Sequence, residues 1–306
     1  MTDNKPKSVG ASVRQRLLNI SRENRTDFVV TLSDYAHERL LYRLSCSQHR
    51  DRFVLKVAML FRIWSDEPHR TTRDMDLMAY GNPAAEDIAR LFREVCELPV
   101  ENDGVVFQGE SLRVEEIREA QEYDGVRVRI TATIAGARVR LQIDVGFGDA
   151  VVPPAEEMTY PALLDFPAPR IKTYARETMI AEKFQAMVSL GIANSRMKDF
   201  YDIYVLATKC EFNGPMVQSA IKATFERRYT PVPPGIPTAL TAEFSEDRTK
   251  LAQWRAFVSS GKVRQSALTL ADAVQVLKSF LLAPTGAVSQ GRSFDARWVP
   301  PGPWTE

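Results

Sequence analysis

The chain has 306 residues, 44% of them hydrophobic and 26% charged, which is ordinary for a soluble globular protein of roughly two domains. Its net charge of +1 excludes a uniformly basic surface, and its three scattered cysteines exclude a zinc site or a disulfide framework. Because it shows neither a signal peptide nor a run of about 18 apolar residues, we expect a cytoplasmic protein with no membrane contact.

The first half of the chain predicts an α+β domain. In order, the patterns indicate a basic helix at 11–24, a helix at 33–48, a strand at 53–55, a helix at 57–65, a strand at 74–78, a helix at 82–96 and strands at 112–119, 125–134 and 137–146. Gly136 supplies the turn of a hairpin between the last two strands.

The second half predicts only helices. After a proline-rich crossing, helical periodicity is found at 177–190, 196–208, 215–228, 243–259 and 269–282, followed by a tail rich in Gly, Pro and Ser. We therefore predict a basic N-terminal extension at 1–25 and an α+β core domain at 26–155. An all-helical C-terminal domain follows at 156–283, and a flexible tail at 284–306.

Three aspartates are the main candidates for chemistry. Successive strand residues point to opposite faces, so Asp74 and Asp76 share one face, and Asp144 lies on the polar row of a second strand. Three carboxylates on neighbouring strands repel one another unless a cation lies between them, and short aspartates on rigid strands suit Mg²⁺. The alternative is a solvated sheet face balanced by Arg138 and Arg140.

Two lysines are further candidates. Lys56 precedes a predicted helix, where a phosphate could bind, although a surface lysine at the end of an element is as simple a reading. Lys183 falls on the apolar arc of its predicted helix, so its ammonium either extends to solvent or meets an anion such as a triphosphate or a carboxylate.

A charged run follows in the next predicted helix. Lys198 and Asp202 are four residues apart on one helix face, with Asp199 one turn from Asp202. This spacing is also that of an ordinary surface ion-pair ladder. The sequence contains no phosphate-binding or dinucleotide-binding glycine motif and no pattern of a Ser-His-Asp or Cys-His nucleophile.

An ordered set of motifs over roughly residues 30–210 resembles the AbiEii/AbiGii nucleotidyltransferase toxins, which include the MenT-type toxins. The matching segments are Phe53-Val-Leu-Lys56, Arg70-Thr-Thr-Arg-Asp74-Met-Asp76-Leu, Gln142-Ile-Asp144-Val, Glu177-Thr-Met-Ile-Ala-Glu-Lys183 and Arg196-Met-Lys-Asp199-Phe-Tyr-Asp202. The resemblance implies a polymerase-β-like nucleotidyltransferase core with a mixed sheet, followed by a helical C-terminal domain.

The resemblance also implies roles for single residues. Asp74, Asp76 and Asp144 match the magnesium-binding carboxylates, the third of which can act as a base in the wider superfamily. Lys183 matches the lysine that holds the triphosphate, and Asp202, or with less support Asp199, matches a required downstream aspartate. The residues placed in nucleotide binding are Lys56, Val57, Ala58, Thr72, Lys183, Lys198 and Asp199.

The implied activity is transfer of a nucleoside monophosphate from a nucleoside triphosphate to RNA with a pair of Mg²⁺ ions between the aspartates and the phosphates, and the tRNA 3′ end is the expected acceptor. Such a capped tRNA cannot be aminoacylated, so translation stops, and an antitoxin encoded by a neighbouring gene restrains the toxin. The arginines available for the RNA backbone are Arg127, Arg129, Arg138 and Arg140. The preferred triphosphate and the oligomeric state stay open.

Two positions bear on regulation and on alternatives. The family has glycine where this chain has Val57, which could weaken nucleotide binding because valine restricts both the backbone and close approach to a phosphate. Thr72 matches a site at which phosphorylation silences related toxins, by adding negative charge beside the carboxylates. The simpler alternative, which the sequence alone favours, is that Thr71 and Thr72 are ordinary strand or turn hydroxyls. The alternatives are transfer to a protein hydroxyl, or an impaired regulator that binds nucleotide or RNA without turnover.

Overall fold

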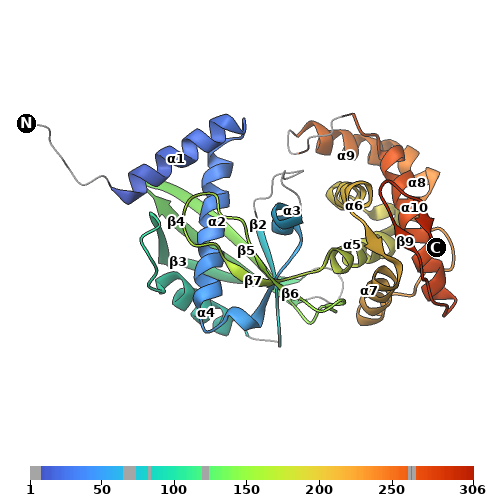
Figure 1. The fold of residues 1–306 in the computed structure, drawn as a ribbon, viewed down its shortest axis with the longest axis horizontal. Coiled ribbons are helices and arrows are strands. Elements are labelled where there is room, and N and C mark those ends of the chain that lie inside the picture. The colour runs from blue at the N-terminus through green and yellow to red at the C-terminus, as the bar shows by residue number, and fades with distance from the viewer. Residues whose placement is uncertain (1–7, 65–73, 82–83, 119–123, 261–262, 264–266) are drawn as a thin grey trace, which may run out of the picture. The chain divides into compact units, whose positions relative to one another are not determined.

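The computed structural model describes residues 8–64, 74–81, 84–118, 124–260, 263 and 267–306. These residues form two compact units (Figure 1). The first contains the described residues up to Gly148 together with Glu156–Thr173, and the second contains Asp149–Ala155 and Tyr174–Glu306.

The first unit is built on one seven-stranded mixed sheet. Its strands are β1 (Phe53–Leu55), β2 (Asp74–Ala79), β3 (Val105–Arg118), β4 (Asp124–Ile134), β5 (Ala137–Phe147), β6 (Glu156–Thr159) and β7 (Arg170–Thr173). Their order is β3-β4-β5-β2-β1-β7-β6, in which β2 pairs parallel to β5 and β1 parallel to β7. The mixed sheet predicted from the family resemblance is confirmed.

Helices cover one face of this sheet. They are α1 (Val9–Glu23), α2 (Phe28–Cys46), α3 (Phe61–Trp64) and α4 (Ala85–Glu97), with the 3₁₀ turns η1 (Arg50–Arg52) and η2 (Val57–Leu60). Figure 1 shows α2 across the sheet, and α2 packs on β5 while α4 packs on β3. The apolar row of β5 is buried beneath them, which leaves the polar row of β5 on the opposite face.

The N-terminal helix is part of this unit and not a separate extension ending at residue 25. Val13 and Leu17 on α1 are fully buried, and α1 packs against α2 and β4. The exposed arginines of α1, such as Arg14 and Arg22, lie on its outer side. The amphipathic spacing of α1, which the basic composition obscured, explains why it folds onto the core.

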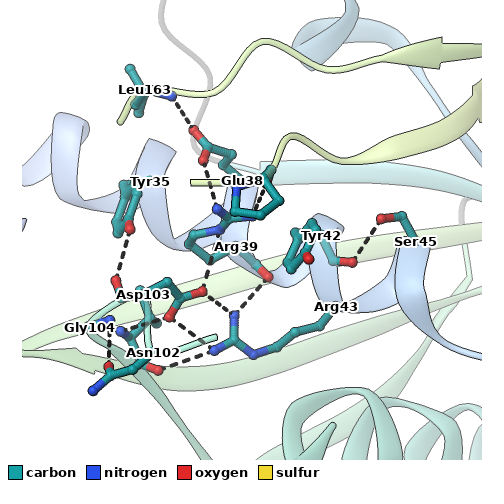
Figure 2. Close-up of polar contacts among 12 residues, drawn as sticks. Tyr35, Glu38, Arg39, Tyr42, Arg43, Ser45, Asn102, Asp103, Gly104 and Leu163 are labelled. Carbon is teal, nitrogen blue, oxygen red and sulfur yellow. Dashed lines mark hydrogen bonds and ion pairs between the residues drawn. The ribbon is translucent and has the colours of Figure 1, made fainter. Parts of the chain in front are cut away.

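A buried charged network joins α2 to two loops of the first unit (Figure 2). Arg43 donates to both carboxylate oxygens of Asp103, with N···O distances of 2.7 and 3.1 Å, and the hydroxyl of Tyr35 donates to the Asp103 carbonyl at 2.8 Å. Asp103 thereby holds the segment that leads into β3. On the same helix Glu38 accepts the backbone N–H of Leu163 at 2.7 Å, which ties down the loop between β6 and β7.

Glu38 should make the stability of the first unit depend on pH. Its side chain is fully buried, and burial raises the pKa of its carboxyl from 4.5 to about 7, although the Leu163 N–H and Arg39 act in the opposite direction. Between these values the folded state holds a proton that the unfolded chain has lost. The free energy of unfolding should therefore fall by up to about 3 kcal/mol as pH rises through this window.

Glu38→Gln removes this titration, so we expect its unfolding free energy to change less with pH than that of the wild type between pH 4.5 and 7. Urea denaturation at a series of pH values measures both slopes. Asp34 also titrates in this range, because burial raises its pKa to about 6, so Asp34→Asn is the matched second variant. Equal slopes for wild type and Glu38→Gln would show that Glu38 does not titrate in the folded protein.

The second unit is mainly helical. Its helices are α5 (Arg176–Leu190), α6 (Met197–Lys209), α7 (Gly214–Arg227), α8 (Ala242–Glu246), α9 (Arg248–Ser259) and α10 (Leu270–Ser289), with 3₁₀ turns η3 (Gly191–Ala193) and η4 (Thr238–Leu240). A small sheet joins β8 (Phe212–Asn213), β9 (Arg297–Trp298) and β10 (Trp304–Thr305). The single helix predicted at 243–259 is two helices, because Asp247 caps the start of α9.

Two predicted boundaries are wrong. The sheet of the first unit extends past residue 155, because β7 pairs with β1 and β6 pairs with β7. The segment 284–306 is not a flexible tail: α10 continues to Ser289, and Trp298 is fully buried, its indole N–H donating to the Ala207 carbonyl at 2.7 Å. Buried aromatic anchors hold this segment despite its Gly and Pro content.

Candidate active site

The three candidate aspartates lie on one face of the first unit's sheet. The parallel register of β2 and β5 places Asp76 directly beside Asp144, and Asp74 beside Gln142. The residues between them, Met75 and Ile143, are fully buried on the opposite face. Directly paired residues project to the same side of a sheet, so Asp74, Asp76 and Asp144 lie on one face, as the alternation of the strands predicted; their convergence on one cation-binding pocket stays a prediction.

Lys56 stands next to this face. Its backbone is extended, and its N–H donates to the carbonyl of Asp76 at 2.8 Å, so it continues the pairing of β1 with β2. The following segment is held on α2 by Arg62, which donates to Asp34 at 2.7 Å. The end of β1 thus brings a lysine beside the aspartate pair.

Arg127 on β4 is the partner of Asp144. Its Nε donates to Oδ1 and its Nη2 to Oδ2, both at 2.8 Å, in a bidentate pair. The hydrogen bond to Asp144 raises the pKa of the guanidinium, and the charges of Asp144, Asp74 and Glu115 raise it further. The guanidinium is therefore held beside the carboxylate face, whereas the sequence predicted only a contact of Arg127 with the RNA backbone.

The carboxylates are not arranged as a three-ligand metal site. Within the described part of the chain, no group of three or more His, Cys, Asp or Glu side chains is placed to hold a metal ion. The reason on this face is the Arg127–Asp144 pair, which directs both Asp144 oxygens toward β4. Asp74 and Asp76 lie on the same face of β2, and two carboxylate oxygens together with substrate phosphates are ligands that suit Mg²⁺.

Further arginines follow on the same face of the hairpin. Arg129 is opposite Gln142, Arg140 opposite Thr131 and Arg138 opposite Thr133, so all three project to the side of Asp144. Each is exposed, whereas the apolar residues between them are buried. We call Arg129, Arg138 and Arg140 the arginine row; it runs from the aspartates toward the hairpin turn.

The positions expected to contact phosphate lie on η2. Val57 and Ala58 form its first turn, with Lys56 before them. Among the described non-glycine residues, positive φ occurs at Arg25, Ala135 and Tyr229, so the Val57 backbone does not need the conformation that favours glycine. Thr72 lies outside the described residues.

The second candidate cluster is buried between α5 and α6 of the second unit. The Lys183 ammonium donates to Asp199 in a short hydrogen bond and contacts Asp202 at 2.9 Å. Their side chains are 7%, 5% and 0% exposed, respectively, so this is a buried ion cluster. Of the two outcomes that the sequence left open for Lys183, extension to solvent or contact with an anion, the structure shows the second, and the anions are these carboxylates.

The interpretation of Lys198 and Asp202 as a surface ladder is wrong. Lys198 is exposed, whereas Asp199 and Asp202 face the interior and pair with Lys183. Residues four apart on a helix do not share the same exposure when one of them lies at the edge of the buried stripe. Lys198 therefore stays a predicted nucleotide contact without a place in the cluster.

No helix in the described part of the chain is long and apolar enough to cross a membrane.

Comparisons with known proteins agree with the sequence motifs. The model of the family "Nucleotidyl transferase AbiEii toxin, Type IV TA system" matches residues 39–276. Among solved structures, JHP933 from Helicobacter pylori is 14% identical over 83% of this chain and 87% of its own, with a TM-score of 0.45. An H. pylori protein described as a predicted nucleotidyltransferase is 13% identical over 83% of this chain and 90% of its own chain, also with a TM-score of 0.45. No curated protein gave a significant match.

The family match covers both candidate clusters and more than half of the chain. It makes the protein a nucleotidyltransferase of a toxin–antitoxin system and implies an antitoxin partner. With the aspartates, Lys56 and Lys183 in the places described, the chain belongs to the AbiEii nucleotidyltransferase toxin family.

Proposed function

We propose that this enzyme transfers a nucleoside monophosphate from a nucleoside triphosphate to the 3′ hydroxyl of an RNA, with tRNA as the acceptor, and so blocks translation. The observation that supports this most directly is the register that puts Asp74, Asp76 and Asp144 on one face, with Lys56 beside them. This arrangement brings metal-binding oxygens and a cation together on rigid strands, as phosphoryl transfer requires.

The aspartates and Lys56 have separate roles in the proposed transfer reaction. Asp74 and Asp76 would hold Mg²⁺, which neutralises charge on the phosphates when it is bound. Lys56 adds a positive charge beside them. The RNA 3′ oxygen forms a bond to the α-phosphorus, the bond from that phosphorus to the β-phosphate oxygen breaks, pyrophosphate leaves, and the hydroxyl proton passes to water.

For the second cluster we propose the role that the family resemblance implies. Lys183 would supply positive charge to the triphosphate, and Asp199 and Asp202 would hold its ammonium in one position. The support is the burial of the cluster, which restricts the Lys183 side chain.

The arginine row is the surface that we propose for the RNA backbone. Arginine pairs with phosphate through parallel N–H donors, and each neutralised phosphate adds to the salt dependence of binding. Arg138 and Arg140 are exposed on adjacent same-face positions of β5. They could contact two phosphates without contacting the aspartates.

Arg138→Gln/Arg140→Gln should weaken RNA binding about tenfold and reduce the slope of log K against log salt by about 1.5, while the KM for the triphosphate stays unchanged. Fluorescence anisotropy with labelled tRNA at several salt concentrations measures this. The matched control is Arg90→Gln/Arg93→Gln, two exposed arginines on α4, which packs on the opposite face. Equal losses in both double variants would indicate a general charge effect and no specific surface.

Val57→Gly should raise kcat/KM for the triphosphate several-fold. Since the Val57 backbone does not need a positive φ, the expected gain comes from replacing a β-branched residue, which restricts how closely a phosphate can approach the backbone, with glycine. Val57→Ala removes the branch and keeps a Cβ, so it should give an intermediate gain. Steady-state kinetics of pyrophosphate release measures both, and unchanged rates would show that residue 57 does not contact phosphate.

The proposal is tested by incubating the protein with each of the four triphosphates, labelled at the α-phosphate, together with total tRNA. We expect label on RNA and release of pyrophosphate for at least one triphosphate. Label on protein would show transfer to a protein hydroxyl, and triphosphate binding without pyrophosphate release would show a regulator; both would contradict the proposal.

A further inference from the structure

The pair of Arg127 and Asp144 changes what the third carboxylate can do. Asp144 accepts hydrogen bonds from Nε and Nη2 of Arg127 at 2.8 Å each, and its Oδ2 also accepts from the side-chain amide of Gln142 at 3.4 Å. A carboxylate offers about four acceptor sites, so about one is left for a metal ion. Hydrogen bonds from a cation also reduce the electron density that the oxygens can give to a metal.

The position of Arg127 follows from the hairpin. Register pairs Arg127 with Asp144, next to Asp76, so the side chains of the three residues form one row across β4, β5 and β2. Glu115 extends the row on β3, opposite Arg127. Arg127 is partly buried, with 30% of its side chain exposed, which weakens the screening of its charge by water.

Arg127 offsets one of the three negative charges of Asp74, Asp76 and Asp144, and Lys56 adds a second positive charge beside the aspartates. The face therefore attracts divalent cations less strongly than three carboxylates alone would. A cation bound at Asp144 would also compete with Arg127 for the same oxygens.

We propose that Asp144 is a positioning residue, which holds the Arg127 guanidinium as a built-in positive charge beside the phosphate site, and that Asp74 and Asp76 alone bind the divalent cation. This inference rests on the proposed nucleotidyl transfer for its substrate. It differs from the three-carboxylate metal site that the sequence predicted, and it gives Arg127 a role at the triphosphate instead of at the RNA backbone.

The test measures Mn²⁺ binding without nucleotide by isothermal titration and electron paramagnetic resonance, for the wild type, Asp144→Asn, Arg127→Gln and the double variant. We expect one Mn²⁺ per wild-type chain. Asp144→Asn should weaken binding about tenfold, because it removes a negative charge and leaves Arg127 uncompensated, and Arg127→Gln should strengthen binding by a similar factor. The double variant should return to within about twofold of the wild type.

A metal ligand would behave differently. If Asp144 coordinates the ion, the double variant will bind Mn²⁺ at least as weakly as Asp144→Asn, and this result would overturn the inference. Arg170→Gln, which removes an exposed arginine from β7 of the same sheet, is the control and should leave the affinity unchanged. Circular dichroism and thermal unfolding verify that each variant is folded.

A second readout concerns the triphosphate. Arg127→Gln should raise the KM for the triphosphate about tenfold with a smaller change in kcat. Arg127→Lys keeps the positive charge but loses the paired N–H donors of the guanidinium, so it should recover part of the lost affinity. An unchanged KM would contradict a phosphate-facing role. The Mn²⁺ measurements need no acceptor, so a wild type that transfers nothing would contradict the proposed function, while the pattern of metal affinities would still decide this inference.

Discussion

Asp76→Asn should lower nucleotidyl transfer at least about 10³-fold while leaving the protein folded. Asp76 lies at the centre of the carboxylate face, beside Asp144 and one same-face position from Asp74. Replacing the carboxylate by an amide of the same size removes the proposed metal ligand, and the loss of such a ligand raises the barrier by several kcal/mol, which corresponds to this factor. Pyrophosphate release with tRNA as acceptor measures the rate.

The control for Asp76→Asn is Glu157→Gln on β6, the far edge strand of the same sheet, where the carboxylate pairs with Arg50 and Arg170. It should transfer at the wild-type rate. The thermal unfolding of Asp76→Asn should stay close to that of the wild type, because the side chain is only half-buried. A variant that keeps more than a tenth of the wild-type rate would exclude Asp76 as an essential ligand.

Lys183→Met should destabilise the protein by about 3–5 kcal/mol, the usual effect of leaving buried charges without their partner. Asp202 is fully buried and Asp199 nearly so, and both pair with Lys183. Without the ammonium, two carboxylates face each other in the interior between α5 and α6. Urea denaturation monitored by the helical circular dichroism signal measures the loss.

A rescue variant separates charge from packing. Lys183→Met/Asp199→Leu/Asp202→Leu removes every charge of the cluster, and replacement of a buried ion cluster by apolar groups of similar volume is often neutral or stabilising. We expect it to recover most of the lost stability while it still fails to transfer nucleotide. A triple variant as unstable as Lys183→Met would show that the cost comes from packing and not from unpaired carboxylates.

Alternation along strands predicted the carboxylate face. Because the side-chain period of a strand is two, Asp74, Asp76 and Asp144 could be placed on polar rows from the sequence alone. The partner of Asp144 can also be predicted from the sequence. Arg127 and Asp144 lie equally far from the hairpin turn at Gly136, and counting outward from the Ile134–Ala137 pair matches them. The polar row of β5 by itself favours Arg138 and Arg140 as the charges that balance this face.

Long-range partners could not be predicted. The arc of α5 showed that Lys183 faces inward, but only the packing of α6 on α5 identifies Asp199 and Asp202 as its anions. In the same way, the link between Arg43 and Asp103 depends on how the loop before β3 returns to α2. Local patterns specify which side of an element is buried, and not which distant residue it meets.

For the C-terminal segment, the sequence composition predicted less order than the structure shows. Its Gly, Pro and Ser content predicted mobility, yet Trp298 and Trp304 bury their rings against Phe280 of α10. Two indoles supply enough apolar area to hold a short segment that composition alone describes as a tail. Isolated bulky residues in such a segment indicate an anchored end.

The most direct test of the account compares intact tRNA with tRNA whose terminal 2′,3′-diol has been oxidised by periodate, each incubated with the protein, Mg²⁺ and α-labelled triphosphate. The account predicts label on intact tRNA, none on oxidised tRNA, and none on either with Asp76→Asn. Equal labelling of oxidised tRNA, or labelling that survives Asp76→Asn, would contradict transfer to an RNA 3′ hydroxyl at the carboxylate face.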